Sequence, residues 1–435
     1  MIIKEVAASL YPWDLADEGI DRCAENLVSR SGVNSIYLVG IMHHEKRPLT
    51  SLFYTHNSKR KFYAPENSRV YYRMDEANFK GTPLKPLYSE REFLKGKDWL
   101  DELTKYGRSH KLKAGAEISH TFYDTEIARS KFPDVLQKDI HGRAIDRYFC
   151  SNNEQVRDYM RAIFYDTVKN HDIDFIQTCL MLFNTGTPVP APWFFNTWME
   201  TNDPENRLSA LLGVARGGCF CDHCGQKARQ LGYDWDAITR DMAKLEAMAT
   251  SSATTNNDVV MDTHLLLGSN LMESGLLLEW PTLFQFLEFR MKCITTLFKE
   301  LYAAVKEANP KVELRYNNYL RYPELAGLEY RAVRDYLDSV RDSDYSEQTG
   351  AKDDFRYKRN TLLKIRRGIG FEKELLAAFA VRPNATPELL KRCIKVLSEL
   401  GVDGFSLGHY DGSHMEHLDA VKQGMLEANV ELVKS

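Results

Sequence analysis

Short runs rich in apolar and β-branched residues alternate with longer helical stretches along the chain. In the helical stretches the apolar residues recur every three or four positions, which is the spacing of a helix with one face on a core. Regular alternation of strands and helices is typical of an α/β fold with parallel strands. We therefore expect one sheet whose strands are joined by helices on its outside.

The alternation gives eight strand–helix pairs. The predicted strands are Ile3–Ser9, Ser35–Ile41, Leu112–Ser119, Asp174–Leu182, Val312–Tyr319, Ser343–Gln348, Leu375–Val381 and Gly404–His409. The helices that follow them are Asp14–Arg30, Trp99–His110, Glu154–Asn170, Thr282–Ala308, Tyr330–Val340, Asp354–Gly368, Pro387–Leu400 and Met415–Val433. Eight such units predict a single (β/α)₈ barrel, with its reaction site in the loops after the strands. An open doubly wound sheet is the main alternative, but no Gly-x-Gly-x-x-Gly follows a strand.

Two of the connections after strands are much longer than the few residues that such connections usually take. Met42–Asp98 follows the second strand, and Phe183–Trp280 follows the fourth. We interpret residues 1–435 as one barrel domain, in which 183–280 is an insertion that carries a cysteine cluster.

Composition and charge narrow the class of protein. The chain has 435 residues, 43% of them hydrophobic and 27% charged, as in soluble globular proteins. Its net charge of −4 provides no positive field for a nucleic acid or an anionic membrane surface. The start, MIIKEVAASLYPW, has no apolar stretch after a basic segment. We therefore expect a cytoplasmic protein that binds neither nucleic acid nor membrane, and a homo-oligomer stays open.

The strongest local motif is the run Cys219-Phe-Cys221-Asp-His-Cys224. Its C-x-C-x₂-C spacing gathers three thiols in a tight turn, as a tetrahedral Zn²⁺ site requires. The fourth ligand would be Cys150, Cys179 or His223. A site of four cysteines has no open position and would be structural, fastening the insertion to the barrel.

The segment Tyr148–Arg157, together with the Cys219–Cys224 run, resembles in order and spacing the zinc-binding cysteines of family 42 β-galactosidases. The catalytic domain of that family is a (β/α)₈ barrel, and related glycoside-hydrolase-like barrels share the motif. The resemblance covers mainly residues 100–230. It implies a structural zinc held by Cys150, Cys219, Cys221 and Cys224, and a carbohydrate substrate.

The chain departs from that family at the expected catalytic positions. The family's fourth strand ends in an Asn-Glu pair that carries the general acid/base, whereas the stretch Asp174–Asn184 has no acid at that place. The seventh strand, where the family's nucleophile lies, continues to Asn384 without an acid. The family's two-glutamate pair is therefore not carried over to this chain.

Glycoside hydrolysis needs two carboxyl groups flanking the scissile bond. Acids at the carboxyl ends of the predicted strands are the candidates, because barrel sites form there. They are Glu117, Asp344, Glu347 and Asp411. We favour Glu117 and Glu347 as the catalytic pair, with the two aspartates in reserve.

Aromatic, amide, imidazole and guanidinium groups at the same strand ends suit the faces and hydroxyls of a sugar. The candidate substrate-binding residues are His43, His44, His120, Trp193, Arg315, Asn317, Asn318, Tyr345, Arg382 and His409. The arginines would also suit an acidic sugar. We therefore predict a glycoside hydrolase acting on an oligosaccharide or glycoside.

Two alternatives to the hydrolase remain open. The histidines and acids at the mouth are also the ligand types of metal-dependent sugar isomerases, epimerases and lyases. The missing strand-four glutamate would also fit a catalytically inactive barrel that binds glycans.

Overall fold

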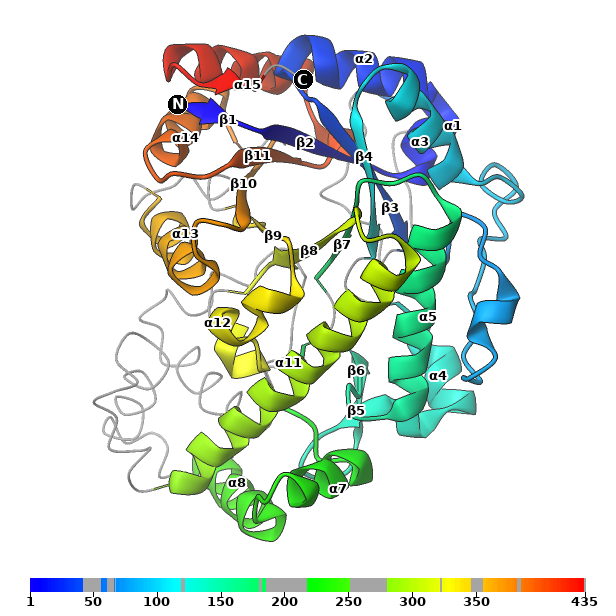
Figure 1. The fold of residues 1–435 in the computed structure, drawn as a ribbon, viewed down its shortest axis with the longest axis vertical. Coiled ribbons are helices and arrows are strands. Elements are labelled where there is room, and N and C mark those ends of the chain that lie inside the picture. The colour runs from blue at the N-terminus through cyan, green and yellow to red at the C-terminus, as the bar shows by residue number, and fades with distance from the viewer. Residues whose placement is uncertain are drawn as a thin grey trace.

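A closed barrel of parallel strands forms the centre of the molecule (Figure 1). The computed structural model describes residues 1–41, 56–60, 66, 68–118, 122–179, 182–184, 217–250, 280–320, 323–345, 355–381 and 385–433. The barrel strands are β2 (Glu5–Leu10), β3 (Ser35–Ile41), β4 (Lys113–Ile118), β7 (Phe175–Thr178), β8 (Glu313–Asn318), β9 (Ser339–Asp342), β10 (Glu374–Ala380) and β11 (Gly404–Gly408). Each pairs in parallel with the next along the chain, and β11 pairs with β2. The predicted (β/α)₈ barrel is confirmed.

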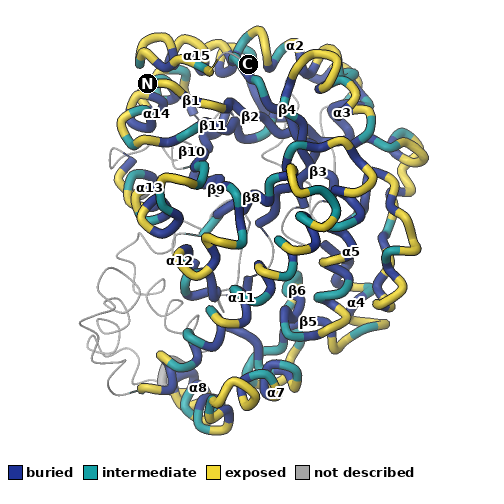
Figure 2. Tube along the Cα trace, in the orientation of Figure 1, coloured by how far each residue is buried: buried dark blue, intermediate teal, exposed yellow. Residues whose placement is uncertain are grey.

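Helices surround the strands and turn their apolar faces inward, so that the strands are buried on both sides (Figure 2). The larger ones are α2 (Ile20–Ser31), α3 (Trp99–Ser109), α5 (Glu154–Asn170), α11 (Pro281–Ala308), α13 (Arg356–Ile369), α14 (Pro387–Ser398) and α15 (Met415–Glu427). In α14, Thr386 caps the first turn by accepting from the amide of Leu389, with Pro387 at the first helical position. The local sequence thus sets this boundary as predicted.

Smaller elements extend the barrel. They are α1 (Pro12–Glu18), α4 (Thr125–Lys131), α7 (Asp222–Gln230), α8 (Trp235–Thr250), α12 (Tyr330–Val333), the antiparallel pair β5 (Leu136–Lys138) and β6 (Ala144–Phe149), and the parallel pair β1 (Ile2–Ile3) and β12 (Glu431–Leu432). Short 3₁₀ turns cover Glu76–Phe79, Pro133–Val135, Pro323–Ala326, Arg334–Tyr336 and Tyr410–Gly412. The α7 and α8 helices lie beyond the ring of strands, beside the start of α11 (Figure 1). Among the described residues, none of the helices has both the length and the apolar character needed to cross a bilayer.

The sixth strand corrects the sequence prediction. It is β9, at Ser339–Asp342, whereas the sequence placed a strand at Ser343–Gln348 and a helix at Tyr330–Val340. The helical pattern there is only the short α12 followed by a 3₁₀ turn. The prediction failed because β9 points the charged side chain of Arg341 into the barrel, so the strand lacks the apolar alternation that marks a half-buried strand.

The barrel interior is apolar at mid-height. Ala7, Tyr37, Phe175 and Leu376 form a separate buried cluster there. A Cβ on Gly115 would lie 2.4 Å from the Phe175 ring, so only glycine leaves room for that ring. This layer closes the barrel and separates its floor from its mouth.

The floor, at the amino ends of the strands, is an ion network. Arg315 donates two hydrogen bonds of 2.8 Å to the carboxylate of Glu5, and Lys113 bonds both Glu5 and Glu313. Burial would raise the pKa of Glu5, but the charges of Arg315 and Lys113 lower it to about 2. The floor is therefore an ion network that links β2, β4 and β8.

Candidate active site

Four polar side chains line the inside of the barrel just above the apolar layer. They follow from strand alternation, because every second residue of a barrel strand points inward. Glu117 lies two residues beyond Gly115 on β4, and Gln177 lies two beyond Phe175 on β7. Asn317 on β8 and Arg341 on β9 complete the set. All four lie at or near the carboxyl ends of their strands, where barrel enzymes hold their sites.

Glu117 is held by the amide of Gln177. The Nε2 atom of Gln177 donates a hydrogen bond of 2.8 Å to Oε2 of Glu117, and both side chains are buried. The other amide atom, Oε1 of Gln177, is buried without a hydrogen-bond partner in the described part of the chain. It is an acceptor at the mouth that a sugar hydroxyl would satisfy.

Arg341 connects three sides of the mouth. Its guanidinium donates to Ser406 and Asn317 at 2.7 Å each, and to the hydroxyl of Tyr345 at 2.8 Å. Burial would lower the pKa of Arg341, but the Tyr345 and Tyr37 phenols and the Glu117 carboxyl raise it above its ordinary value. The arginine stays cationic and faces Glu117.

An aromatic wall of Tyr11, Tyr345 and His409 adjoins Arg341. The His409 ring stacks on Tyr11 with centroids 5.4 Å apart, and its Nδ1 lies 2.8 Å from the Tyr11 hydroxyl. Tyr345 tilts toward His409 at a centroid distance of 6.2 Å, over Gly408, where a Cβ would lie 2.6 Å from the tyrosine ring. His409 itself has a left-handed φ of 61°, an uncommon conformation for a residue with a side chain.

The structure brings together Glu117, Asn317, Tyr345 and His409 among the residues singled out from the sequence. It places Arg315 elsewhere: its guanidinium lies in the barrel floor with Glu5, below the apolar layer. The prediction that Arg315 binds substrate is therefore wrong. Position 315 is three residues before the end of β8, one inward position below Asn317, and its side chain reaches the floor.

Two further candidates lie on the outer side of the barrel wall. Asn318 donates to Asp342 at 2.7 Å, and both side chains alternate outward, away from the mouth. Asp344 follows on the same side: its charge, after burial, helps to raise the pKa of Asp342 to about 7. The placement of Asn318 at the mouth is therefore wrong, because its amide donates to Asp342, whereas the catalytic assignment of Asp344, which follows the end of β9, stays a prediction.

Asp411 also lies behind the mouth. It is fully buried in the 3₁₀ turn Tyr410–Gly412, close to Asp14 of α1. Burial and the charge of Asp411 together raise the pKa of Asp14 well above its usual range. Asp411 therefore lies in a buried acidic pair with Asp14, and its assignment as a catalytic acid stays a prediction.

Several predicted site residues lie outside the described residues. They are His43, His44, His120, Trp193, Glu347 and Arg382. Their assignments stay predictions.

Sequence reasoning missed Gln177, Arg341 and Tyr11. Arg341 was lost with the misplaced sixth strand. The family resemblance directs attention to a carboxylate at the end of the fourth strand, and Gln177 is an amide. Inward alternation from Phe175 would have found it.

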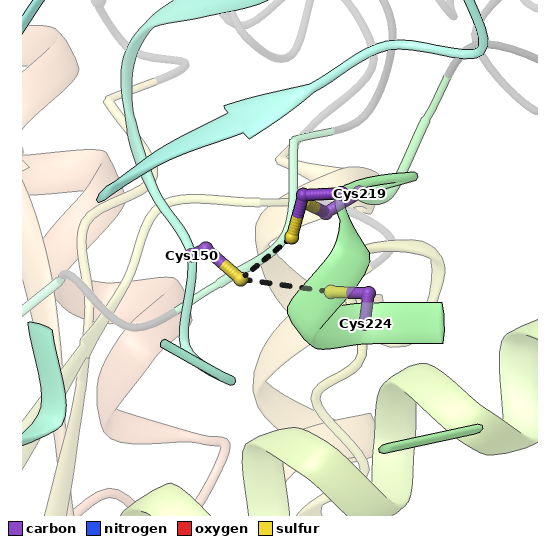
Figure 3. A group of neighbouring side chains, drawn as sticks. Cys150, Cys219 and Cys224 are labelled. Carbon is purple, nitrogen blue, oxygen red and sulfur yellow. Dashed lines mark hydrogen bonds between the residues drawn. The ribbon is translucent and has the colours of Figure 1, made fainter. Parts of the chain in front are cut away.

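The cysteine cluster forms a compact, buried group next to α7. The ligand atoms of Cys150, Cys219, Cys221 and Cys224 all lie within 4.8 Å of one another, with Cys150 Sγ at 3.4 Å from Cys221 Sγ and 3.6 Å from Cys224 Sγ. Figure 3 shows the Cys150 sulfur turned toward the sulfurs at the start of α7. Four sulfurs at about 2.3 Å from one tetrahedral ion lie about 3.8 Å apart. The cluster therefore has the size and ligand set of a metal site.

The thiols of this cluster do not ionise alike: the neighbouring thiol of Cys219 raises the pKa of Cys150, burial raises the pKa of Cys224, whereas the pKa of Cys221 is lowered. The thiol of Cys150, followed by those of Cys219 and Cys224, lowers the pKa of Cys221. The amide of Lys138 donates to Cys219 Sγ at 3.4 Å, and Asn152 donates to Cys224 Sγ at 3.2 Å. Thiolates are the form that binds metal ions.

Comparison with solved structures places this barrel among known folds. The chain superposes on a β-galactosidase from the psychrophilic Marinomonas ef1 with a TM-score of 0.52 and 12% identity, covering 98% of this chain and 59% of that one. It superposes on a β-galactosidase from Halorubrum lacusprofundi with a TM-score of 0.54 and 13% identity, covering 98% and 57%. The chain has the barrel fold of these glycoside hydrolases.

The catalytic domain of a β-amylase from Paenibacillus polymyxa gives a TM-score of 0.52 at 11% identity, covering 98% of this chain and 99% of that one. The chain thus spans nearly all of the β-amylase domain but less than two thirds of each β-galactosidase. No protein-family model matches the sequence, and the search of curated proteins found no match.

Proposed function

We propose that this chain is a glycoside hydrolase whose reaction takes place at the barrel mouth around Glu117. The observation that carries the proposal is the buried Glu117 carboxylate, bonded by Gln177 and facing cationic Arg341, beside an aromatic wall. A carboxylate for the anomeric carbon and ring faces for the sugar are the two features that hydrolysis of a glycosidic bond requires.

In this proposal Glu117 acts as the ionised carboxylate. A hydrogen bond from an amide and a nearby guanidinium both favour the charged form of a carboxyl group. Glu117 would then stabilise or attack the developing positive charge on the sugar ring, and a second, protonated acid would serve the leaving oxygen. Glu347, which follows the end of β9 by five residues in the sequence, supplies that acid in our assignment.

Asn317, Gln177 and His409 would orient the sugar. Asn317 is fixed by Arg341, so its amide has a set direction, and Gln177 has a spare buried acceptor. Tyr345 and His409 present ring faces on which the C–H surface of a sugar packs. This lining suits an oligosaccharide or glycoside, with either a neutral or an acidic sugar.

A panel of chromogenic glycosides and uronides, together with unlabelled oligosaccharides, tests the activity. Wild-type protein should release the aglycone or reducing ends from at least one substrate, and the double variant Glu117→Gln/Glu347→Gln should bind that substrate without turnover. Binding with no turnover by the wild type would favour the inactive glycan-binding barrel. Turnover that the double variant retains in full would refute the assignment of the acids.

We infer further that the metal of the four-cysteine cluster is zinc in a structural role. Four thiolates leave no open position, and soft sulfur ligands suit Zn²⁺. Cys150 follows β6, and the other three cysteines stand at the start of α7, so the ion would join segments that lie far apart in the sequence. Arg290, buried close to Cys224 and Cys219, would offset the negative charge of the site.

A further inference from the structure

A second group of metal-ligand side chains lies at the rim of the mouth, away from the cysteines. After β11 the chain turns through Tyr410–Gly412 and enters α15 at Met415. His414, Glu416 and His417 stand at this first turn, and one ligand atom from each lies within 4.8 Å of the others. Because α15 follows the carboxyl end of a barrel strand, the group lies at the same end of the barrel as Glu117.

His417 is held as a metal ligand would be. Its side chain is 3% exposed, and its Nε2 contacts the backbone carbonyl of Ala385. A carbonyl oxygen only accepts, so Nε2 must carry the proton and Nδ1 of the neutral ring has a bare lone pair. Histidines that bind metals commonly donate their other ring N–H to a backbone carbonyl in this way.

The bare nitrogen has no partner. Nδ1 of His417 is buried, and no hydrogen bond reaches it within the part of the chain that the structure describes. A buried polar atom left without a partner destabilises the fold, and a bound ligand would remove that cost. Because Nε2 is occupied by Ala385, Nδ1 is the ring nitrogen of His417 that is left to bind a ligand.

The other two side chains are also uncommitted. His414 occupies the N-cap position of α15, but its side chain does not cap the helix, and its ring centroid lies 5.4 Å from that of His417. Among the described residues, neither the His414 ring nor the Glu416 carboxylate has another hydrogen bond or ion pair. No hydrogen bond or ion pair within the described residues therefore explains why these side chains lie so close together.

We propose that His414, Glu416 and Nδ1 of His417 form a binding site for a divalent transition-metal ion such as Zn²⁺. Two imidazoles and a carboxylate form a ligand set for zinc and its neighbours, whereas Ca²⁺ and Mg²⁺ prefer oxygen alone. The positive end of α15 opposes a cation there, and the Glu416 carboxylate offsets this. Three protein ligands leave coordination positions for water or a ligand at the rim. The proposal does not rest on hydrolase activity.

Calorimetric titration of the full chain with Zn²⁺ tests the site. The protein is first dialysed against a chelator and its remaining metal measured, so that only uptake above that content counts. Wild type should take up one further Zn²⁺ per chain, and Mg²⁺ should give no binding. The affinity for this further Zn²⁺ should fall at least tenfold in His414→Ala, in Glu416→Gln and in His417→Gln.

The matched control is His110→Ala, which removes an exposed histidine at the end of α3 and should bind as wild type does. His414 and Glu416 are not buried, so their variants keep the test valid if His417→Gln fails to fold. A wild type with no further uptake, or His414→Ala and Glu416→Gln variants with unchanged affinity, would overturn the proposal.

Discussion

Gln177 donates a hydrogen bond of 2.8 Å to Glu117, so that the fourth barrel strand presents an amide to the mouth and the third presents the carboxylate. The two side chains come from neighbouring strands, with Glu117 and Gln177 in register. Hydrolysis at this mouth would therefore depend on a carboxylate one strand away from the position that the family resemblance implied.

Replacing the amide by an acid should create a shared proton. In Gln177→Glu two carboxyl groups lie within hydrogen-bond distance, and like charges cannot both ionise freely. The folded pair then holds a proton that the unfolded chain loses, so stability relative to wild type should fall as pH rises from 5 to 8. Each unit of raised pKa costs about 1.4 kcal/mol. Thermal unfolding across that range measures the effect.

The control for this variant is Gln226→Glu, an exposed position on α7. It should show the same stability difference from wild type at every pH in the range. A flat difference for Gln177→Glu as well would mean that Glu117 and residue 177 do not share a site.

The ion pair between Glu5 and Arg315 should make a large contribution to the free energy of unfolding, and this contribution should fall at acid pH. Glu5→Gln leaves Arg315 without its two-bonded partner, and breaking a buried pair in this way costs about 3–5 kcal/mol near pH 7. Because the pKa of Glu5 is lowered to about 2, its contribution is present above the ordinary value near 4.5 and is lost as pH falls through 2. Urea unfolding at pH 7 and pH 3 should therefore show a smaller penalty at pH 3.

Glu374→Gln is the matched control, because Glu374 also begins a barrel strand but pairs with Lys4 at the surface. Such a pair is worth about 0–1 kcal/mol. If Glu5→Gln and Glu374→Gln lower the free energy of unfolding equally, the ion network of the floor does not stabilise the barrel as we propose.

Asp342 should weaken the wild type at alkaline pH. Burial, and then the charge of Asp344, raise its pKa to about 7, so the folded state holds a proton that the unfolded state releases near pH 4. The contribution of Asp342 to stability is therefore fully present below pH 4 and is lost as pH rises through 7. Asp342→Asn keeps the acceptor for Asn318 without ionising, and its gain in stability over wild type should be larger at pH 8 than at pH 5 by on the order of 2 kcal/mol.

Thermal midpoints at the two pH values check this prediction. Asp419→Asn, on the exposed face of α15 beside Arg30, is the control and should show no gain at pH 8. An Asp342→Asn variant that is less stable than wild type at pH 8 would contradict the raised pKa.

Loss of one thiolate should remove the structural metal. In Cys221→Ser, measured by plasma mass spectrometry after chelator dialysis, the zinc content should fall by one ion per chain and the thermal midpoint should drop. Cys393→Ala, on the buried face of α14, changes a cysteine outside the cluster and should keep its zinc. Unchanged zinc in Cys221→Ser would refute the site.

The barrel could be predicted from sequence because seven of the predicted strands overlap the strands of the structure, and their buried residues carry the apolar pattern. The sixth strand escaped because Arg341 faces inward and bonds polar partners, which no hydropathy pattern reports. The sequence also places Arg315 at the mouth, because a hydropathy pattern does not show how deep in the barrel a charged side chain lies. Its depth along the strand, and not its residue type, assigns it to the floor.

The candidate site could be predicted only in part, because the direction of each side chain depends on strand register as well as on residue type. Glu117 and His409 were found because residues at strand ends are expected to matter. The sides on which Asp344 and Tyr345 lie depend on strand register, which follows from the pairing of Asn318 with Asp342 across β8 and β9. The His414–His417 group was missed because its members meet through a helix turn and the distant carbonyl of Ala385.

The most direct test of the central claim is the hydrolytic kcat of Glu117→Gln beside that of Glu399→Gln, an exposed glutamate at the end of α14. With the best substrate from the glycoside panel, Glu117→Gln should lose a factor of about 10²–10⁴ in kcat with little change in substrate affinity, and Glu399→Gln should match wild type. If Glu117→Gln hydrolyses that substrate at the wild-type rate, the mouth carboxylate is not catalytic and the proposed mechanism is wrong.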